Sequence, residues 1–292
     1  MHVKAYSCHA AQKCSGPLTI NTSADASALS SCATFKGDVI ISDQASGTIS
    51  IDGVQQITGS VRCENAGAVS EISADDLGTI GGIFYLQNLT TLSSLNFGSL
   101  NNVNEIYWVG LPALQSLNFA QGVSQANNVL ISNTELNSLS GIELETVGNM
   151  DINNNPFLTT VNVNDITNLT GSLNFAANAA SLDITFQNLQ QANNMSFRNA
   201  SSVSMPSLSA VNGSLGFYSG TFESFSAPNL TLTGGTLAFV DCPSLSNISF
   251  PQLKEIGGGF LIANNTQLKT IDGFPDLQTI VGALDFAGTF NK

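Results

Sequence analysis

The chain has 292 residues, of which 10% are Asp, Glu, Lys or Arg, and its formal net charge is −13. This sparse, acidic charge disfavours nucleic-acid and anionic-lipid binding, because Arg198 is the only basic residue between Arg62 and Lys254 and no patch there neutralises a run of phosphates. The hydrophobic fraction of 42%, regularly spaced, is too high for a disordered chain, so we expect a folded protein.

The two ends of the sequence bear on targeting. Residues 1–14 lack the apolar stretch of a secretory signal, and the last residues, AGTFNK, form no hydrophobic tail. We therefore expect that a secreted form of the protein has lost its targeting segments from this sequence. No apolar run reaches about 18 residues, the length that spans a bilayer.

The chain has five cysteines, and four of them fall in the first 63 residues. We assign residues 1–13 to an N-terminal extension and residues 14–36 to a cap linked by a disulfide between Cys14 and Cys32. An odd count leaves at least one thiol unpaired. Cys63 either belongs to the core or joins the cap.

Residues 21–32 (NTSADASALSSC) predict one short helix within the cap. Ser23 is the expected N-cap, because a serine oxygen accepts a hydrogen bond from an otherwise unpaired amide at a helix start. Ala28 and Leu29 form the apolar side that we expect on the first coil, where the helix would cover the open end of a solenoid.

Residues 37–292 repeat a motif that opens with apolar anchors. Two copies align without a gap, IGGIFYLQNLTTLSSL from Ile80 and IGGGFLIANNTQLKTI from Ile256. The first anchors, 20 to 24 residues apart, are Val39, Val61, Phe84, Ile106, Val129, Met150, Leu173, Met195, Leu215, Leu237, Phe260 and Leu284. This narrow register predicts a solenoid of about twelve coils of about 22 residues, in one elongated domain.

Each unit opens with two anchors two residues apart, such as Phe84 and Leu86 or Ile106 and Trp108. A period of two predicts a strand with both anchors facing inward. Further apolar residues follow at steps of three, which a short helix would also give, but Gly, Asn, Pro and Ser interrupt nearly every unit. We predict an all-β fold, a right-handed parallel β-helix or leucine-rich-repeat-like solenoid.

A third inward position often holds asparagine, as at Asn155, Asn178 and Asn265. In leucine-rich repeats, Asn or Cys at such a position hydrogen-bonds to the backbone of the turn. Cys242 takes this position in one coil. We interpret it as a buried, unpaired ladder residue, with a disulfide as the alternative.

The opening CSGPLTINTSADASALSSCATFKGDVIIS and coils such as IGGGFLIANNTQLKTI resemble fungal GPI-anchored cell-wall organisation proteins, the extracellular-mutant thirty-three family with its sporulation-specific relatives. The likeness covers residues 14–286 and leaves Cys8 unexplained. It implies a fold similar to the receptor L domain and a surface glycoprotein of plasma membrane and wall, needed for wall integrity. It implies no enzymatic activity, no cofactor and a lipid anchor that is inferred rather than present in the sequence.

Nine N-x-S/T sequons predict glycosylation at Asn21, Asn88, Asn168, Asn194, Asn199, Asn212, Asn229, Asn247 and Asn264. Asn88, Asn199 and Asn264 each lie two residues after a second anchor. We expect a solvent-facing corner of the coil at that position.

The inventory of reactive groups predicts no catalytic residues. The histidines, His2 and His9, both lie in the extension, which excludes a Ser-His-Asp or Cys-His site in the solenoid. A glycosidase needs two carboxylates about 5–10 Å apart, but the outward neighbours of Asp151 on the next coils are Asn174 and Ser196. No cluster of oxygen ligands predicts a metal site.

The outward residues of successive first strands run Ile40, Arg62, Tyr85, Tyr107, Leu130 and Asp151. Tyr85, Tyr107 and Leu130 should be neighbours one strand spacing apart, joined by Val109. Aromatic rings in a row suit the apolar faces of sugars, and clustered exposed apolar groups mark interaction sites. We hypothesise a glycan- or protein-binding strip. The alternatives are that a loop or glycan covers these residues, or that they merely favour strand formation.

The sequence therefore predicts a noncatalytic cell-surface glycoprotein that contributes to fungal cell-wall organisation by binding wall polysaccharide or a surface protein. One alternative is a receptor L-domain-like module that recognises a protein ligand. A carbohydrate-active β-helix enzyme is the third interpretation. We expect the protein in the cell wall and at the outer face of the plasma membrane, held there only through the inferred lipid anchor.

Overall fold

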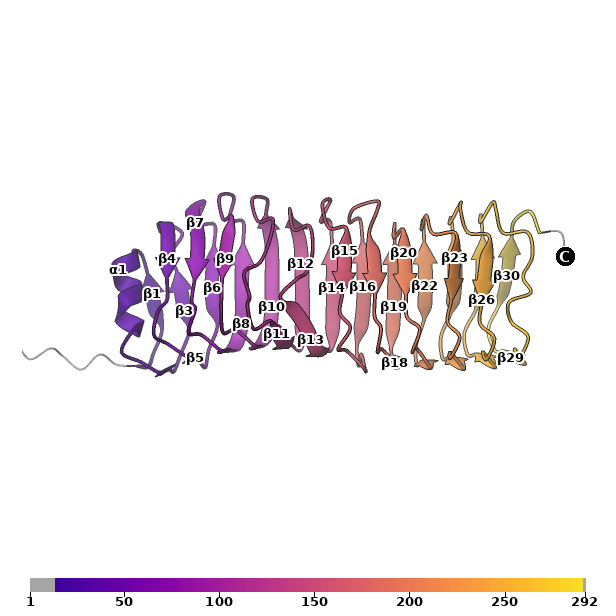
Figure 1. The fold of residues 1–292 in the computed structure, drawn as a ribbon, viewed down its shortest axis with the longest axis horizontal. Helices are drawn as coiled ribbons and strands as arrows, with labels where there is room; N and C mark the ends of the chain where they lie inside the picture. The colour runs from indigo at the N-terminus through magenta and orange to yellow at the C-terminus, as the bar shows by residue number, and fades with distance from the viewer. Residues whose placement is uncertain (1–13, 291–292) are drawn as a thin grey trace, which may run out of the picture.

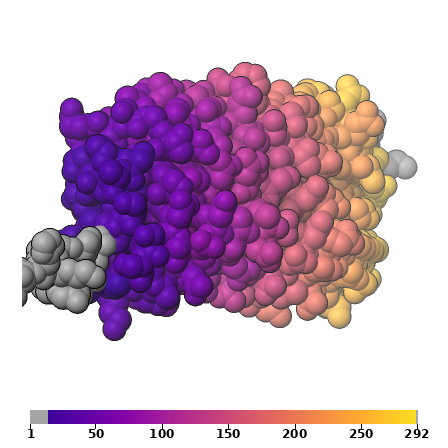
Figure 2. Space-filling view, turned by 60° about the vertical axis from the view of Figure 1, so that its left-hand side comes forward, coloured from indigo at the N-terminus to yellow at the C-terminus, as the bar shows by residue number. Residues whose placement is uncertain are grey.

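The computed structural model of the protein describes residues 14–290, so Cys8 and both histidines lie outside the described residues. The chain coils along a single axis from α1 at one end to β30 at the other (Figure 1). Successive bands of colour along the molecular surface follow the same order (Figure 2). Nearly all elements are strands, and neighbouring strands run parallel, which confirms the predicted β-solenoid of about twelve coils.

The rod has strands on three sides, although individual coils lack a strand on the second or the third side. The first strand of each coil belongs to the main sheet, whose strands in spatial order are β1 (Leu18–Ile20), β3 (Val39–Ile41), β6 (Val61–Glu64), β8 (Thr79–Gln87), β10 (Asn102–Leu111), β12 (Asn128–Thr134), β14 (Asn149–Asn153), β16 (Ser172–Ala176), β19 (Asn194–Arg198), β22 (Leu215–Tyr218), β25 (Leu237–Val240), β28 (Phe260–Ala263) and β30 (Leu284–Ala287).

Shorter strands line the other two sides. The second side has β2 (Thr34–Phe35), β5 (Gln56–Ile57), β11 (Val123–Gln125), β13 (Ile142–Thr146), β18 (Gln191–Ala192), β21 (Ala210–Val211), β24 (Leu232–Thr233), β27 (Glu255–Ile256) and β29 (Thr279–Ile280). The third side has β4 (Ser46–Ser50), β7 (Ala68–Ser73), β9 (Ser94–Asn96), β15 (Thr160–Asn162), β17 (Asp183–Thr185), β20 (Ser202–Ser204), β23 (Ser224–Ser226) and β26 (Asn247–Ser249). The long strands β8 and β10 continue around a corner and join the main sheet to the second side.

The register of the main sheet confirms every predicted first anchor. Each anchor is the Cα partner of the next, from Val39 with Val61 at one end to Phe260 with Leu284 at the other. The register is strongly specified, because a slip of one residue would turn the buried side chains of a strand to solvent.

Aromatic stacking continues this repetition inside the core. The second anchors Phe175, Phe197, Phe217 and Phe239 lie on consecutive main-sheet strands, with ring centroids 6.1, 5.3 and 4.8 Å apart and nearly parallel planes. All four side chains are buried. Identical side chains stack here because parallel, in-register strands place equivalent residues directly above one another.

The chain turns at the end of the main-sheet strands through one residue in the left-handed conformation, with φ between 52° and 63° in nine coils. Six of these residues are Asn, which tolerates this conformation better than most residues other than Gly. Asn88, Asn199 and Asn264 are among them and are exposed, which confirms the predicted solvent-facing corners.

The asparagine ladder is confirmed. Asn155, Asn178 and Asn265 each donate from Nδ2 to a carbonyl oxygen of the preceding coil, at 3.1, 2.9 and 2.9 Å. Cys242 is buried and unpaired at the equivalent position, as interpreted, and its amide donates to the Oδ1 atom of Asn265 at 2.9 Å. Cys63 is also a free, buried thiol, so it belongs to the core and does not join the cap.

The capping helix is present but shorter than expected, as α1 (Ser23–Ala26) followed by the 3₁₀ turn η1 (Ser27–Leu29). The prediction of Ser23 as N-cap is wrong, because Thr22 holds that position. The carboxylate of Asp25 accepts a hydrogen bond from the Thr22 amide at 2.9 Å, and this backward contact fixes the helix start. The Ser23 hydroxyl donates instead to the carbonyl oxygen of Thr48 at 2.7 Å.

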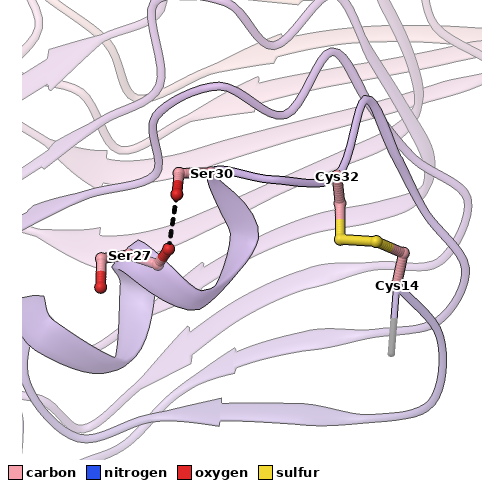
Figure 3. Close-up of a disulfide and its surroundings, with 4 residues drawn as sticks. All are labelled: Cys14, Ser27, Ser30 and Cys32. Carbon is pink, nitrogen blue, oxygen red and sulfur yellow. Dashed lines mark hydrogen bonds between the residues drawn. A yellow bond between two sulfur atoms is a disulfide. The ribbon is translucent and has the colours of Figure 1, made fainter. Parts of the chain in front are cut away.

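The disulfide between Cys14 and Cys32 is confirmed, with Cα atoms 5.6 Å apart. It ties the chain before β1 to the segment after the capping helix (Figure 3). Leu29 is buried as expected, but Ala26 rather than Ala28 completes the apolar side of the helix, since Ala28 is only partly buried.

The two ends of the described solenoid differ. The cap contributes a strand of its own, β1, which pairs with β3 and was not predicted. At the other end β30 pairs with β28, and Leu284 is 58% exposed. Within residues 14–290, no helix has both the length and the apolar character needed to cross a membrane.

Candidate binding face

The outward side of the main sheet, called the outer face below, carries the predicted strip. The Tyr strip comprises Tyr85 on β8, Tyr107 and Val109 on β10, and Leu130 on β12. Tyr107 is the Cα partner of both Tyr85 and Leu130, and all four side chains are partly exposed. The predicted neighbours are therefore in place, and the binding role of the strip stays a prediction.

The two tyrosines form a stack that runs along the solenoid axis. Their ring centroids are 4.6 Å apart and their planes differ by 7°. Arg62, on the strand at the other side of Tyr85, places its guanidinium carbon 5.2 Å from the Tyr85 centroid. Both faces of Tyr85 are thus covered, and its ring edge remains for a ligand. On the side of Leu130, no ring or guanidinium among residues 14–290 stacks on Tyr107.

The Tyr85 hydroxyl is held in place on the same strand, where it donates a hydrogen bond to the Oε1 atom of Gln87. Desolvation, then the negative charge of Glu64 and the neighbouring Tyr107 ring, raise the pKa of Tyr85 above its ordinary value, against the opposing effect of Arg62. The hydroxyl is therefore protonated at neutral pH and presents a fixed polar group at the edge of the strip.

A shallow groove of about 420 Å³ lies beside Tyr85 and opens toward the N-terminal end of the outer face. Ile40, 37% exposed, supplies an apolar surface in it, Arg62 a positive charge, and Asp43 and Glu64 carboxylates. The groove therefore combines an aromatic edge, an apolar patch and both signs of charge, which suits a ligand with many polar groups and some apolar surface.

Beyond Leu130 the outer face becomes a fixed polar surface. The Oδ1 atom of Asp151 accepts hydrogen bonds from the amide groups of Asn153 and Asn174, both at 2.8 Å. Asn174 and Ser196 follow Asp151 on the next strands, as predicted. Among residues 14–290, no three His, Cys, Asp or Glu side chains lie close enough together to hold a metal ion.

Comparison with known proteins places this architecture in a family. No family model matches the chain, and no solved structure matches it. The chain is 48% identical over 280 residues to a cell surface GPI-anchored protein of Arthroderma benhamiae, covering 96% of this chain and 72% of the relative. It is 46% identical over 275 residues to protein ecm33 of Aspergillus fumigatus, covering 94% and 69%. The chain belongs to the ecm33 family of fungal wall proteins.

The sporulation branch of the ecm33 family is more distant. Sporulation-specific protein 2 of Saccharomyces cerevisiae is 33% identical over 263 residues, which cover 89% of this chain and 52% of that relative. The resemblance seen in the cap and the coils is thereby confirmed.

Exposure of the sequons is consistent with an ecm33-type surface glycoprotein. All nine predicted asparagines are exposed in the structure. Their spacing leaves a gap, because no sequon occurs between Asn88 and Asn168. The coils that carry Tyr107 and Leu130 fall within this gap, so no N-glycan can be attached to them, whereas Asn88 follows Tyr85 on its own coil and Asn168 lies in the coil of Asp151. Occupancy of the individual sequons stays a prediction.

Two further residues of the outer face were missed. Arg198 ends β19 and Tyr218 ends β22, and their side chains are in contact, with the guanidinium carbon 4.3 Å from the ring centroid. They occupy a second outward position, two residues after Ser196 and Gly216. Following both outward positions of each strand, rather than the first alone, would have found them.

Proposed function

We propose that this chain is the folded part of a noncatalytic, extracellular glycoprotein that contributes to fungal cell-wall organisation by binding wall glycan through its outer face. Membership of the ecm33 family supports a cell-wall role. Relatives named as cell surface GPI-anchored proteins, together with a cell wall protein ecm33 of Schizosaccharomyces pombe, support a location in the wall or at the outer face of the plasma membrane. Attachment to the membrane would occur through a lipid anchor.

The single observation that carries the glycan proposal is the stack of Tyr85 and Tyr107 beside Arg62 on the outer face. Apolar side chains that are clustered and partly exposed on a surface tend to mark an interaction site. Tyr107 and its neighbour Leu130 offer an apolar platform to a sugar ring, while the Tyr85 hydroxyl and the side-chain amides around Asp151 offer hydrogen bonds to sugar hydroxyls.

A protein ligand is the second candidate. Tyr and Arg are enriched among residues that dominate protein–protein binding energy, and exposed Ile40 extends the same groove with an apolar contact. This interpretation corresponds to a receptor L-domain-like module and uses the same surface.

The test is sedimentation of the purified protein with insoluble β-glucan, chitin and mannan, beside the variant Tyr85→Ala/Tyr107→Ala. Phe157→Ala is a matched control, since Phe157 is 55% exposed and lies outside the main sheet. We expect saturable binding to one of these glycans that the double variant loses and the control keeps.

Three results would contradict the proposal. If the double variant still binds glycan, the Tyr strip is not the binding site. Absence of binding to every glycan would favour the protein ligand, to be sought by pull-down from fungal membranes. Release of soluble sugars from the glycans would favour the carbohydrate-active enzyme.

A further inference from the structure

The arginines and tyrosines of this chain gather on the outer face. Arg62 and Arg198 are the only arginines in the sequence, and Tyr85, Tyr107 and Tyr218 are three of its four tyrosines. All five point outward from the main sheet. Each arginine stacks on a tyrosine of the next strand, at 5.2 Å for the first pair and 4.3 Å for the second. The same arrangement thus occurs twice on one face.

Both guanidinium groups are available to a ligand. Within residues 14–290, the guanidinium group of neither Arg62 nor Arg198 donates a hydrogen bond or forms an ion pair, and each is held by its contact with a ring. A guanidinium carries five N–H donors in a planar fork. Stacking on a tyrosine fixes that plane while leaving the donors at its edge free, so less side-chain entropy is lost when a ligand binds.

The second pair is accommodated by a glycine in the sheet. A Cβ atom on Gly216 would lie 2.6 Å from Cε2 and 2.7 Å from the hydroxyl oxygen of Tyr218. Only glycine at this outward position lets the ring of Tyr218 lie back along its own strand. A shallow hollow of about 260 Å³ forms beside the ring, and Asn174, Ser196 and the sequon residue Asn194 are among its lining residues.

The outer face between the two pairs is apolar at Leu130 and polar beyond it. Tyr107 on β10 and Tyr218 on β22 are five strand spacings apart, or about 24 Å at the usual spacing of parallel strands. Leu130, Asp151 and Asn174 occupy the first outward position in between. A single sugar cannot contact both tyrosines, whereas an oligosaccharide laid along the solenoid axis can.

The charge of this surface selects the kind of polymer. The carboxylate of Asp151 lies between the two pairs, and the chain carries a formal net charge of −13, so a polyanion would be repelled along most of its length. A neutral chain rich in hydroxyl groups finds donors in the arginines and acceptors in Asp151. The side-chain amides of Asn153 and Asn174 on the intervening strands can supply both hydrogen-bond donors and acceptors.

We propose that Arg62, Tyr85 and Tyr107 at one end and Arg198 and Tyr218 at the other are two stations of one site for an extended, neutral polysaccharide. This inference rests on the proposed function, because it presumes that the outer face binds glycan. Linking two stations in one ligand raises affinity without any new contact, provided that the chain spans the distance between them.

The experiment is calorimetric titration with neutral β-1,3-linked gluco-oligosaccharides of graded length, from the disaccharide upward. For the unmodified protein we expect affinity to rise steeply once the chain spans about 24 Å. Tyr218→Ala should weaken binding of these long chains by about tenfold or more while leaving the short ones unchanged. Phe157→Ala should change neither, and the fluorescence of the buried Trp108 should confirm that each variant is folded.

The outcomes separate the two proposals. Long chains that bind Tyr218→Ala as tightly as the unmodified protein would overturn the two-station site while leaving glycan binding intact. No binding at any length, with chito- and manno-oligosaccharides included, would overturn both. Tighter binding of phosphorylated mannan than of neutral glycans would overturn the assignment of a neutral ligand.

Sequons at Asn194 and Asn199 flank the second station, so the titrations are run on intact and on enzymatically deglycosylated protein. We expect the same length dependence in both forms, because Asn194 lies at the start of β19 with its Oδ1 atom accepting a hydrogen bond from the Ser214 amide, and Asn199 lies at the turn beyond the end of the strand. Length dependence in the deglycosylated form alone would mean that N-glycans cover the second station, and would overturn the site for the natural protein.

Discussion

Replacing Asn155 with alanine should destabilise the solenoid more than its small change in volume suggests. The Asn155 side chain is fully buried. Its Oδ1 atom accepts hydrogen bonds from the amide and the hydroxyl of Thr134, at 3.1 and 2.7 Å, and its Nδ2 atom donates to the carbonyl oxygen of Ile131 at 3.1 Å. Alanine removes these three bonds, together with a fourth from Nδ2 to the Oδ1 atom of Asn178 at 3.1 Å, and leaves buried polar groups on the preceding coil without partners.

The magnitude follows from these bonds. A neutral hydrogen bond contributes about 1 kcal/mol net, and a buried partner left unpaired costs at least as much. The expected loss is therefore about 3 kcal/mol in the free energy of unfolding. Asn178 limits the damage, since its Oδ1 atom keeps the hydrogen bond from the amide of residue 155.

The assay is urea unfolding followed by the fluorescence of Trp108, the only tryptophan in the chain, which is buried two main-sheet strands away. With an m-value of about 3 kcal/mol/M, a loss of about 3 kcal/mol lowers the unfolding midpoint by about 1 M urea. Asn137→Ala is the matched control, because Asn137 is exposed and its side chain makes no hydrogen bond. The control should stay within about 0.5 kcal/mol of the parent. Equal midpoints for the two variants would refute the reasoning that the buried amide ladder holds neighbouring coils together.

Three further perturbations follow from the same structure. Cys14→Ser/Cys32→Ser removes a disulfide between residues 18 apart in sequence and should lower the free energy of unfolding by about 3 kcal/mol. We expect faster proteolysis of the cap in this variant, and an unchanged cleavage rate would contradict a stabilising role of the disulfide. Phe217→Ala should lower the free energy of unfolding in urea by about 4 kcal/mol, because the Phe217 ring is buried in the stack. The control Phe157→Ala, at an exposed position, should lower it by less than about 0.5 kcal/mol, and similar losses for the two variants would contradict the buried stack. Burial raises the pKa of Cys63 to about 12 from 9.0, so its thiol should resist a thiol reagent at pH 8 until urea is added. The free energy of unfolding should fall as pH rises from about 9 toward 12, because the Cys63 thiol then ionises in the unfolded chain but not in the folded protein. Labelling of Cys63 in the native protein, located by mass spectrometry, would count against this.

Much of the solenoid could be predicted from the sequence because its information is local and repeated. The apolar pair at Phe84 and Leu86 indicates which face of its strand is buried, and the next apolar pair, which begins 22 residues later, gives the same indication for the next strand. Parallel strands in register then make Tyr85 and Tyr107 neighbours, so the position of the strip could be derived before any coordinates. Cys14 and Cys32 could be paired for a similar reason, since they bracket one short segment.

Other features depended on contacts that no local pattern records. The stacking of Arg198 on Tyr218 depends on where the ring lies, and the ring takes its position only because Gly216 leaves room for it. Sequence placed Tyr85 on the surface, but the stacking that covers both its faces is decided by its neighbours in space.

Periodicity fixed which residues of this protein face inward, because burial repeats with the strand and a one-residue error would expose a whole set of side chains. The positions of the shorter strands in each coil and the N-cap of the helix depended on tertiary structure. Apolar residues at steps of three are compatible with several ways of bending the coil. Thr22 rather than Ser23 caps the helix because the Asp25 carboxylate accepts a hydrogen bond from the Thr22 amide. What the outer face presents to a ligand was likewise decided only by packing, since an outward side chain has no core to fix its orientation and takes it from the side chains on either side.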